Sequence, residues 1–319
     1  MTRRVLLAGL GQIGMGYDVA WPAASVLTHA RAASVHPSFD LIAAVDPLVE
    51  RRERFKATYG VPAYPTLELA LEAHHPEVVV IAGPTDQHGE MVRTLLRLQT
   101  PKALLCEKPL AVELVEARSL VASCAERNVS LYVNYVRQSD PGVIEVKRRL
   151  EAGEIRGPVK GVVWYSKGLL HNGSHFFNLL QYWVGPFERG AIFDRGRLWE
   201  GRDPEPGIHA VFKHGSVVFV AAREEDYSHY TVELIAANGR LRYDDGGALI
   251  TWQPARRGLL SASVPSLAEP EVIPSGMARY QWHVMEQLDR ALNGLDAAIC
   301  SGADALAAQE AMSSLLENR

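Results

Sequence analysis

Residues Val5–Gly16, VLLAGLGQIGMG, constrain this chain more than any other stretch. Val5–Ala8 is an apolar run typical of a strand buried on both faces, and it leads directly into a G-x-G-x-x-G turn. In such a turn the first glycine permits a tight bend, the second lets a pyrophosphate approach the backbone, and the third lets the following helix pack closely. That helix would offer backbone N–H groups to the phosphates. The alternative is a plain strand–turn–helix, and the position of the motif favours a dinucleotide site. The candidate cofactor residues here are Gly9, Gly11, Gln12, Ile13 and Gly14.

A second strand-like run, Leu41–Val45, ends at Asp46, whose carboxylate could hold the ribose hydroxyls of the dinucleotide. An arginine or serine directly after this acid would accept a 2′-phosphate, but Pro47 and Leu48 follow it. NAD is therefore favoured over NADP, although two arginines come shortly afterwards.

The spacing between the glycine turn and Asp46 is longer than usual. Asp46 follows Gly14 by 32 residues, where about 20 is typical. The surplus lies in Met15–Thr28, which reads as an insertion at the mouth of the cofactor site. It is either a surface loop or a lid, and in a lid Tyr17, Asp18 and Trp21 would be the contacting side chains.

Length and composition exclude several classes of protein. The 319 residues suffice for two domains with separate cores, and the net charge of −4 argues against a nucleic-acid partner or a membrane surface. Three cysteines, Cys106, Cys124 and Cys300, lie far apart and fit reduced thiols rather than disulfides or a zinc site. Glycines interrupt the apolar start too soon for a signal peptide, and no run is long enough to span a membrane. We expect a cytoplasmic protein.

Strand and helix patterns alternate over residues 1–134, which predicts an α/β domain with a doubly wound parallel sheet. Ligands bind beyond the carboxyl ends of the strands in such sheets. The residues that follow the predicted strands are therefore further candidates: Gly83, Pro84, Thr85 and His88 for the cofactor, and Asn134 and Arg137 for the substrate. The predicted strands are Val5–Ala8, Leu41–Val45, Val78–Ala82, Ala103–Cys106 and Leu131–Val133, and the helical stretches between them include Thr66–Ala73, His88–Leu98 and Val112–Arg127.

The pattern changes after residue 134, and residues 135–319 read as a second, α+β domain. Asp140-Pro141 is typical of a helix start. Strand-like runs with short connections then predict a mostly antiparallel open sheet, followed by two helices. The sequence shows no internal repeat. The polar segment 254–276 is predicted to be a long loop or linker. The predicted strands are Val159–Ser166, His209–Phe212, Val217–Ala222, Tyr230–Ala236 and Leu249–Trp252, and the helices are Arg279–Leu292 and Ala303–Leu316.

Two short motifs carry candidate chemistry. Glu107-Lys108-Pro109 follows a buried strand, where a charged pair is costly unless the site uses it, and the lysine could stabilise a developing alkoxide. The second motif is His171-Asn172-Gly173-Ser174-His175, in which Ser174 is the predicted N-cap of a helix. His175 in the first helical turn would be kept neutral by the helix dipole and could act as a base. Tyr165 and Lys167, at the end of the preceding strand, are candidate pocket residues.

Each of these assignments has a structural alternative. Lys108 could be structural, and His175 could be bonded to backbone. His171 is balanced between a substrate contact and a structural partner, as Tyr165, Lys167 and Arg137 are between pocket and packing roles. The spacing of His171 and His175 could suggest a metal, but we expect the glycine and the cap between them to break the helical register, and no metal site is predicted.

In this order and at these spacings, the glycine turn, Glu107-Lys108-Pro109 and the G-x-H motif resemble the glucose–fructose oxidoreductase / inositol dehydrogenase (Gfo/Idh/MocA) family. The resemblance covers the whole chain. It implies a Rossmann domain and an NAD(P)-dependent oxidoreductase that acts on a sugar or related polyol. It also implies that Lys108 contacts the reacting oxygen and that His175 transfers the proton. We further assign Glu107 and Lys108 to the cofactor site, and Tyr17 and Asn172 to the substrate site. An open sheet face that pairs subunits implies a homodimer or homotetramer.

The family pattern is D-x-G-x-H-x-x-D, and this chain has His171 in place of the first aspartate and Asn178 in place of the second. This change puts the usual catalytic trio in doubt, and we keep His171 as its third member. The segment LLHNGSHFFNLL resembles members associated with polysaccharide biosynthesis, which points to a nucleotide-linked or modified sugar. Two alternatives remain open: an enzyme that uses NAD transiently for elimination or hydrolysis, and a non-catalytic protein that senses NAD or a sugar.

Overall fold

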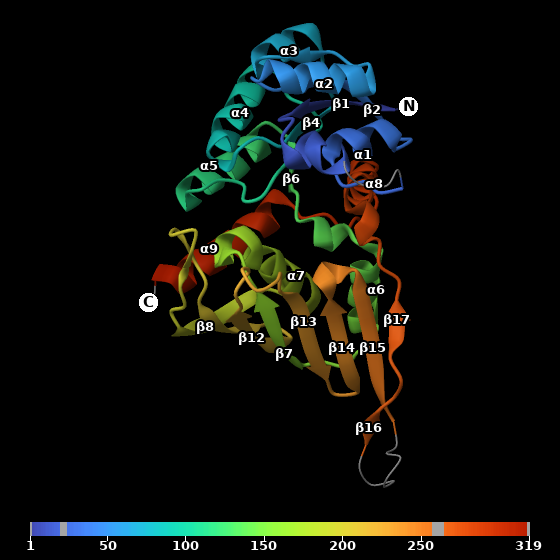
Figure 1. Ribbon diagram of the computed structural model, residues 1–319, viewed down its shortest axis with the longest axis vertical. Coiled ribbons are helices and arrows are strands. Elements are labelled where there is room, and N and C mark those ends of the chain that lie inside the picture. The colour runs from blue at the N-terminus through green and yellow to red at the C-terminus, as the bar shows by residue number, and fades with distance from the viewer. Residues whose placement is uncertain (1, 20–23, 257–264, 318–319) are drawn as a thin grey trace. The chain divides into compact units, whose positions relative to one another are not determined.

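The computed structural model describes residues 2–19, 24–256 and 265–317, and the chain divides into two compact units (Figure 1). Unit 1 comprises residues 1–139 and 278–307, and unit 2 comprises residues 140–277 and 308–319. The predicted domain boundary assigns residues 278–307 to the second domain, whereas in the structure this segment packs within unit 1. Sequence alone could not show this, because the segment completes a core whose other parts lie more than 130 residues earlier.

Unit 1 contains the predicted parallel sheet. Within the described residues its strand order is β3-β2-β1-β4-β5-β6, and every neighbouring pair is parallel. Because β1 and β4 lie at the centre, their carboxyl ends place the turn after β1 beside the segment after β4. The strands are β1 (Arg3–Ala8), β2 (Phe39–Val45), β3 (Ala63–Tyr64), β4 (Val78–Ile81), β5 (Ala103–Cys106) and β6 (Ser130–Val133).

Helices cover both faces of this sheet, as the alternation predicts. Alternate residues of β1 face two different cores, with Leu6 and Ala8 in one and Val5 and Leu7 in the other. Residues of α3, α4 and α5 complete the first core, whereas residues of α1, α2 and α8 complete the second. The fold-class prediction is confirmed for this unit. The helices are α1 (His29–Val35), α2 (Val49–Tyr59), α3 (Leu67–Ala73), α4 (Thr85–Leu98), α5 (Leu114–Glu126) and α8 (Tyr280–Leu292).

Unit 2 is built on a mixed, mostly antiparallel sheet. Its described strands follow the order β16-β15-β14-β13-β7-β12-β11-β8, with β17 beside β15, and only the β7–β12 pair is parallel in this described part. A separate hairpin joins β9 to β10. The strands are β7 (Val159–Tyr165), β8 (Phe187–Asp194), β9 (Leu198–Trp199), β10 (Asp203–Pro204), β11 (Gly207–Phe212), β12 (Gly215–Ala221), β13 (Tyr230–Ala236), β14 (Gly239–Asp244), β15 (Leu249–Arg256), β16 (Ser266–Leu267) and β17 (Glu271–Ile273).

One face of the unit 2 sheet packs against helices. The core there combines alternate strand residues with side chains of α6 (Pro141–Glu151), α7 (Ser174–Val184) and the later part of α9 (Gly302–Glu317). Asp140 caps α6 by accepting hydrogen bonds from the N–H groups of Gly142 and Val143, as its sequence predicts. The opposite-facing residues are less buried, so this part of the fold-class prediction is also confirmed.

Two local predictions are wrong. Segment 254–276 is not a continuous loop, because β15 extends to Arg256 and β16 and β17 pair with it. The glycine turn is not followed by a continuous helix. Instead, Gln12–Gly16 forms one π-helical turn and Tyr17–Val19 a 3₁₀ turn, and the first α-helix of the described residues begins at His29. Among the described residues, no helix has the length and apolar character needed to cross a bilayer.

Candidate active site

The glycine turn after β1 combines tight packing with one open position. Gly9 has a φ of +109°, and a Cβ there would lie 2.5 Å from the carbonyl carbon of Ala82. A Cβ on Gly14 would lie 2.1 Å from the Gly9 carbonyl oxygen. Gly11 differs, since a Cβ there would meet no described atom within 4 Å. Two glycines are therefore required by the fold, whereas Gly11 leaves its backbone open to an approaching group. This geometry fits a dinucleotide pyrophosphate.

Asp46 lies at the end of β2, beside the glycine turn. Its side chain is 3% exposed, and its two carboxylate oxygens accept hydrogen bonds of 2.9 Å from the N–H groups of Leu10 and Leu48. The Arg51 guanidinium lies 3.4 Å from the same carboxylate, and Arg52 binds the Asp46 carbonyl oxygen. A carboxylate has four lone-pair sites, so Asp46 can still accept ribose hydroxyls.

The two ends of the insertion Met15–Thr28 are joined by hydrogen bonds to the Asp18 carboxylate. The Asp18 carboxylate accepts hydrogen bonds from the N–H groups of Leu27 (2.9 Å) and Thr28 (3.0 Å), and from the Thr28 hydroxyl. Thr28 in turn caps α1. Asp18 therefore ties the loop together rather than presenting its carboxylate to a ligand. Tyr17 has an exposed side chain and stays a candidate, and Trp21 lies outside the described residues.

The segments after β4 and β5 are joined by His88. This side chain is fully buried, with Nδ1 3.1 Å from the Pro109 carbonyl oxygen and Nε2 3.0 Å from the Gly83 carbonyl oxygen. The imidazole thus holds the loop that includes Pro84 and Thr85 against the loop that follows Lys108. Its predicted contact with the cofactor is not tested by these bonds, but its position favours an organising role.

Glu107 is a largely enclosed charged group of the candidate site, with a side chain that is 12% exposed. Burial opposes its ionisation, but hydrogen bonds from His29 and Asn134 and the charge of Lys108 together hold the pKa of this carboxyl below its usual value. The residue before it, Cys106, is fully buried, and burial together with the Glu107 charge raises the pKa of its thiol. Sequence reasoning missed His29, although Thr28 ahead of an apolar helical pattern is an N-cap signal that could have located the helix.

Two further residues of unit 1, Arg137 and Tyr280, are candidates for the surroundings of Glu107. Arg137 lies in a 3₁₀ turn after β6, and its side chain is mostly buried. Tyr280 begins α8, and burial together with the nearby charges of Tyr17, Glu107 and Asp18 raises the pKa of its hydroxyl. Tyr280 was missed because it comes from a segment that sequence assigned to the other domain.

The histidine motif of unit 2 forms continuous helical turns. Gly168–Gly173 is a π-helical segment that runs directly into α7, and Gly173 itself has helical φ and ψ. The predicted N-cap role of Ser174 is wrong, because its hydroxyl donates back to the His171 carbonyl oxygen over 3.3 Å. The register between His171 and His175 is therefore not broken as expected. Even so, no group of three or more metal-ligating side chains occurs among the described residues.

Two acids from the following hairpin support this segment. The Asp203 carboxylate accepts hydrogen bonds from the N–H groups of Leu170 (3.0 Å) and His171 (2.8 Å), and Glu205 accepts one from Gly168 (3.1 Å). Burial raises the pKa of Asp203, and the backbone N–H groups oppose that shift. Sequence reasoning missed both acids, which lie more than 30 residues from the motif that they hold.

The remaining candidates of unit 2 have partners of their own. Tyr165 is fully buried, and its hydroxyl donates to the Pro206 carbonyl oxygen over 2.7 Å, because β7 is a central strand and this residue faces the helix-covered side. Lys167 pairs with Glu224 at 3.0 Å. The Asn172 amide donates to the Ser166 carbonyl oxygen over 2.9 Å. These contacts favour structural roles for Tyr165 and Asn172, while Lys167 remains partly exposed.

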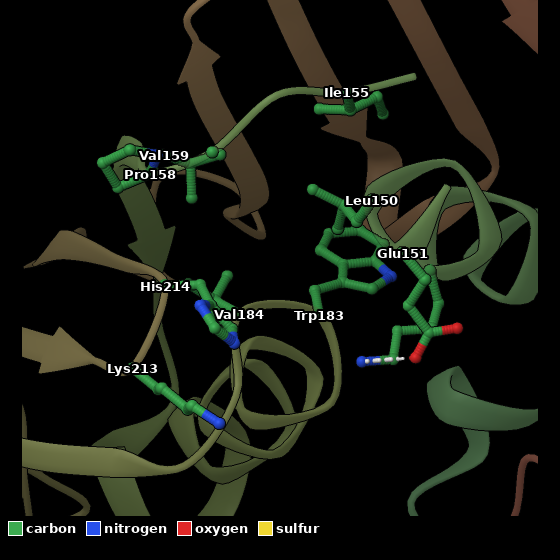
Figure 2. Close-up of a pocket in the computed structure, with 11 residues that line it drawn as sticks. Leu150, Glu151, Ile155, Pro158, Val159, Trp183, Val184, Lys213 and His214 are labelled. Carbon is green, nitrogen blue, oxygen red and sulfur yellow. Dashed lines mark ion pairs between the residues drawn. The ribbon is translucent and has the colours of Figure 1, made fainter. Parts of the chain in front are cut away.

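Unit 2 also contains a cavity of about 580 Å³ that no predicted site residue lines. Figure 2 shows its wall, with Trp183 and Leu150 on one side, Lys213 and His214 on the other, and Glu151 in an ion pair at the rim. Its position at the end of α7 separates it from the histidine motif, which begins that helix. The candidate chemistry therefore does not lie in this cavity.

Comparison with known proteins matches the N-terminal part of the chain to a family model. Residues 3–135 match the family model GFO_IDH_MocA, described as the oxidoreductase family with an NAD-binding Rossmann fold. The Rossmann domain of the chain therefore matches the Gfo/Idh/MocA oxidoreductase family that its motifs resemble. The domain is an NAD-binding one, and the predicted cofactor is confirmed at that level.

One sequence relative and two solved structures of similar fold resemble this chain. The NAD⁺-dependent scyllo-inositol 2-dehydrogenase of Bacillus subtilis is 29% identical over 62% of this chain and 59% of its own length. The chain spans about half the length of the curated relatives that it matches. The WlbA dehydrogenase of Bordetella pertussis, solved with NADH and UDP-GlcNAcA, has a TM-score of 0.71 at 16% identity, over 99% of this chain and 96% of that one. A super-repressor mutant of Gal80p from Saccharomyces cerevisiae has a TM-score of 0.77 at 16% identity, with the same coverage. The two solved structures show the shared fold.

Proposed function

We propose that this protein is an NAD-dependent dehydrogenase or reductase of a sugar, cyclic polyol or nucleotide-linked sugar. The observation that carries the proposal is the arrangement at the carboxyl edge of the unit 1 sheet. There an open glycine turn, an acid suited to ribose and the Glu107-Lys108 pair follow three strands of one sheet. The inositol dehydrogenase relative and the sugar nucleotide bound to WlbA support this class of substrate.

The chain's own residues have distinct roles in the proposed reaction. Gly11 and its neighbours would hold the pyrophosphate and Asp46 the ribose, and the bound nicotinamide accepts or gives up the hydride. In the oxidation direction, the substrate carbon loses a hydride and its hydroxyl loses a proton. Lys108 donates a hydrogen bond to that oxygen and stabilises its negative charge, and His175 takes the proton. The helical turn before His175 is held by Asp203, whose carboxylate accepts a hydrogen bond from the His171 backbone N–H.

The test uses the purified full-length chain. Small molecules released on denaturation are identified by mass, and the native protein is then mixed with NAD or NADP and a panel of inositols, sugars and nucleotide sugars. We expect a nicotinamide cofactor to be bound or to bind, and one class of substrate to give reduced nicotinamide with NAD in preference to NADP. Absence of any nicotinamide binding would refute the proposal.

A second candidate function is a non-catalytic sensor of NAD or sugar. His171 and Asn178 replace the family's two acids, and the shared fold includes the Gal80p super-repressor. Nicotinamide binding without any net redox change, and without consumption of any sugar, would favour this function. Sugar consumption with bound nicotinamide and no net redox change would instead favour the transient use of NAD for elimination or hydrolysis.

We also propose a cytoplasmic location for this protein. Cys106, Cys124 and Cys300 are all free and buried in the structure. Free thiols are typical of a reducing compartment, and we place the protein in the cytoplasm.

We also propose that the protein forms a homodimer or homotetramer through the open face of the unit 2 sheet. We define this open face by the paired residues Val162, Val218 and Val272, together with Trp164 and Ile235. Trp164 and Ile235 are 43% and 49% exposed, and apolar strand residues presented in this way mark an interaction surface.

Trp164→Glu should disrupt this assembly. A charge in the centre of an apolar interface is costly to bury, so we expect the parent chain to sediment as an oligomer and the variant at the 35.1 kDa of one chain. Leu98→Glu is the matched control, because Leu98 ends α4 in unit 1 and is 42% exposed. A parent protein that sediments as a monomer, or a variant that keeps the parent mass, would contradict the assignment.

A further inference from the structure

His29, Glu107 and Asn134 form a buried polar cluster in unit 1. The His29 Nε2 atom lies 2.8 Å from the Glu107 Oε1 atom, and the Asn134 amide donates to the same oxygen over 2.5 Å. The three side chains come from the first turn of α1, the end of β5 and the end of β6. The cluster therefore joins segments separated by up to 105 residues.

The cluster has a defined polarity. An ionised carboxylate can only accept hydrogen bonds, so His29 Nε2 and the Asn134 amide nitrogen are the donors. The Glu107 side chain is 12% exposed and that of His29 is 1% exposed, so the carboxylate has few water molecules to solvate it. Removing a donor from a buried carboxylate favours its protonation, because burial disfavours the charged form.

Glu107 is linked to Lys108 in two ways. Its second oxygen, Oε2, accepts a hydrogen bond of 3.4 Å from the Lys108 backbone N–H. Its charge also interacts with the Lys108 ammonium, and this attraction helps to hold the pKa of Glu107 down. His29 also interacts electrostatically with Glu107, and the Glu107 charge acts on Cys106 and Tyr280.

We propose that His29 is a positioning residue that, with Asn134, keeps Glu107 anionic and thereby fixes the position and charge of Lys108. This inference rests on the proposed function only for the use of Lys108 in turnover. The assignment of His29 follows from the geometry of unit 1, and neither the family match nor the motifs of the sequence point to this residue.

The test measures the acylation rate of the Lys108 amine in the absence of substrate. The full-length chain is treated with a lysine-acylating reagent at fixed pH, and the acylation rate of Lys108 is read by peptide mass spectrometry, with the exposed Lys102 as an internal reference. Loss of the neighbouring anion increases the fraction of neutral amine. We therefore expect Glu107→Gln and His29→Leu to raise the Lys108 rate by about threefold to tenfold, the change expected for a shift of up to one pKa unit.

Two further variants separate positioning from general loosening. His29→Gln retains an N–H donor and should keep the parent rate. His36→Leu makes the same change near the other end of α1, where His36 is equally buried and its Nε2 lies 3.1 Å from a carboxylate oxygen of Glu286. This variant should also keep the parent rate. Melting temperature and NAD affinity are measured for every variant, and His29→Met, which also lacks an N–H donor, replaces His29→Leu if the latter fails to fold.

Several outcomes would overturn the inference. An unchanged Lys108 rate in His29→Leu or in Glu107→Gln would show that the cluster does not control the lysine. Equal increases of the Lys108 acylation rate in His29→Leu and His36→Leu would show that the effect comes from general destabilisation of unit 1. Failure of the proposed function is a separate result, because it would appear as absent turnover in the parent protein while the acylation rates still followed His29.

Discussion

Replacing Lys108 with alanine is expected to lower turnover by about a thousandfold, or about 4 kcal/mol of transition-state stabilisation. The lysine follows β5 at the carboxyl edge of the sheet, where its ammonium can donate to an oxygen that gains negative charge during hydride transfer. NAD affinity should change by less than about threefold, because interactions made mainly in the transition state contribute little to cofactor binding. Steady-state kinetics on the substrate found by the panel, with calorimetric titration of NAD, give both quantities.

Lys102→Ala is the matched control for this experiment. Lys102 precedes the same strand and pairs with Glu77 at 2.8 Å, but its side chain is 65% exposed. Exposed ion pairs contribute little to stability, so this variant should keep parent turnover and parent NAD affinity. If Lys108→Ala retains turnover within about tenfold of the parent, the effect is smaller than the loss of one oxyanion donor, and another residue must stabilise the oxygen.

Gly11→Val should abolish measurable NAD binding without unfolding the protein. A Cβ on Gly11 would meet no described atom, so the free chain has room for the side chain and its melting temperature should stay near that of the parent. The same side chain would occupy the surface that a pyrophosphate must approach. We expect the Kd for NAD to rise by about a hundredfold or more, measured by calorimetric titration, because the loss includes several backbone hydrogen bonds to phosphate.

Gly14→Ala provides the contrasting variant. Its Cβ would lie 2.1 Å from the Gly9 carbonyl oxygen, so the turn must distort to accept it. We expect a lower melting temperature as well as weaker NAD binding, whereas Gly11→Val loses binding alone. Equal NAD affinity in Gly11→Val and the parent would show that the phosphates do not cross the Gly11 backbone.

Much of unit 1 could be predicted from local pattern. Each apolar run of four or five residues, such as Val78–Ile81, became a central strand because both of its faces are covered by helices. The glycine turn, Asp46 and Glu107-Lys108 were found because the carboxyl ends of parallel strands gather at one edge. In unit 2, strands such as Tyr230–Ala236 were found from their alternation and turn residues.

The predictions that failed depended on contacts distant in sequence. In place of the expected helix after the glycine turn, the structure has one π-helical turn and one 3₁₀ turn. The inserted loop is held by Asp18, which accepts hydrogen bonds from the N–H groups of Leu27 and Thr28. Ser174 has the composition of an N-cap, but the preceding turns are already helical and are held by Asp203. Tyr165 looked like a pocket residue because it ends a strand, yet the strand's central place in the sheet buries it.

The sequence by itself determined the Rossmann core, the NAD-binding turn and the resemblance to one oxidoreductase family, because these depend on short motifs and on periodicity within single segments. The tertiary structure decided which groups surround the candidate catalytic residues. His29 and Asn134 reach Glu107, and Asp203 reaches the turn of His171, from distant parts of the chain. A buried carboxylate or a bare helical turn requires hydrogen-bonding partners, but nothing in its local sequence specifies which distant residue supplies them.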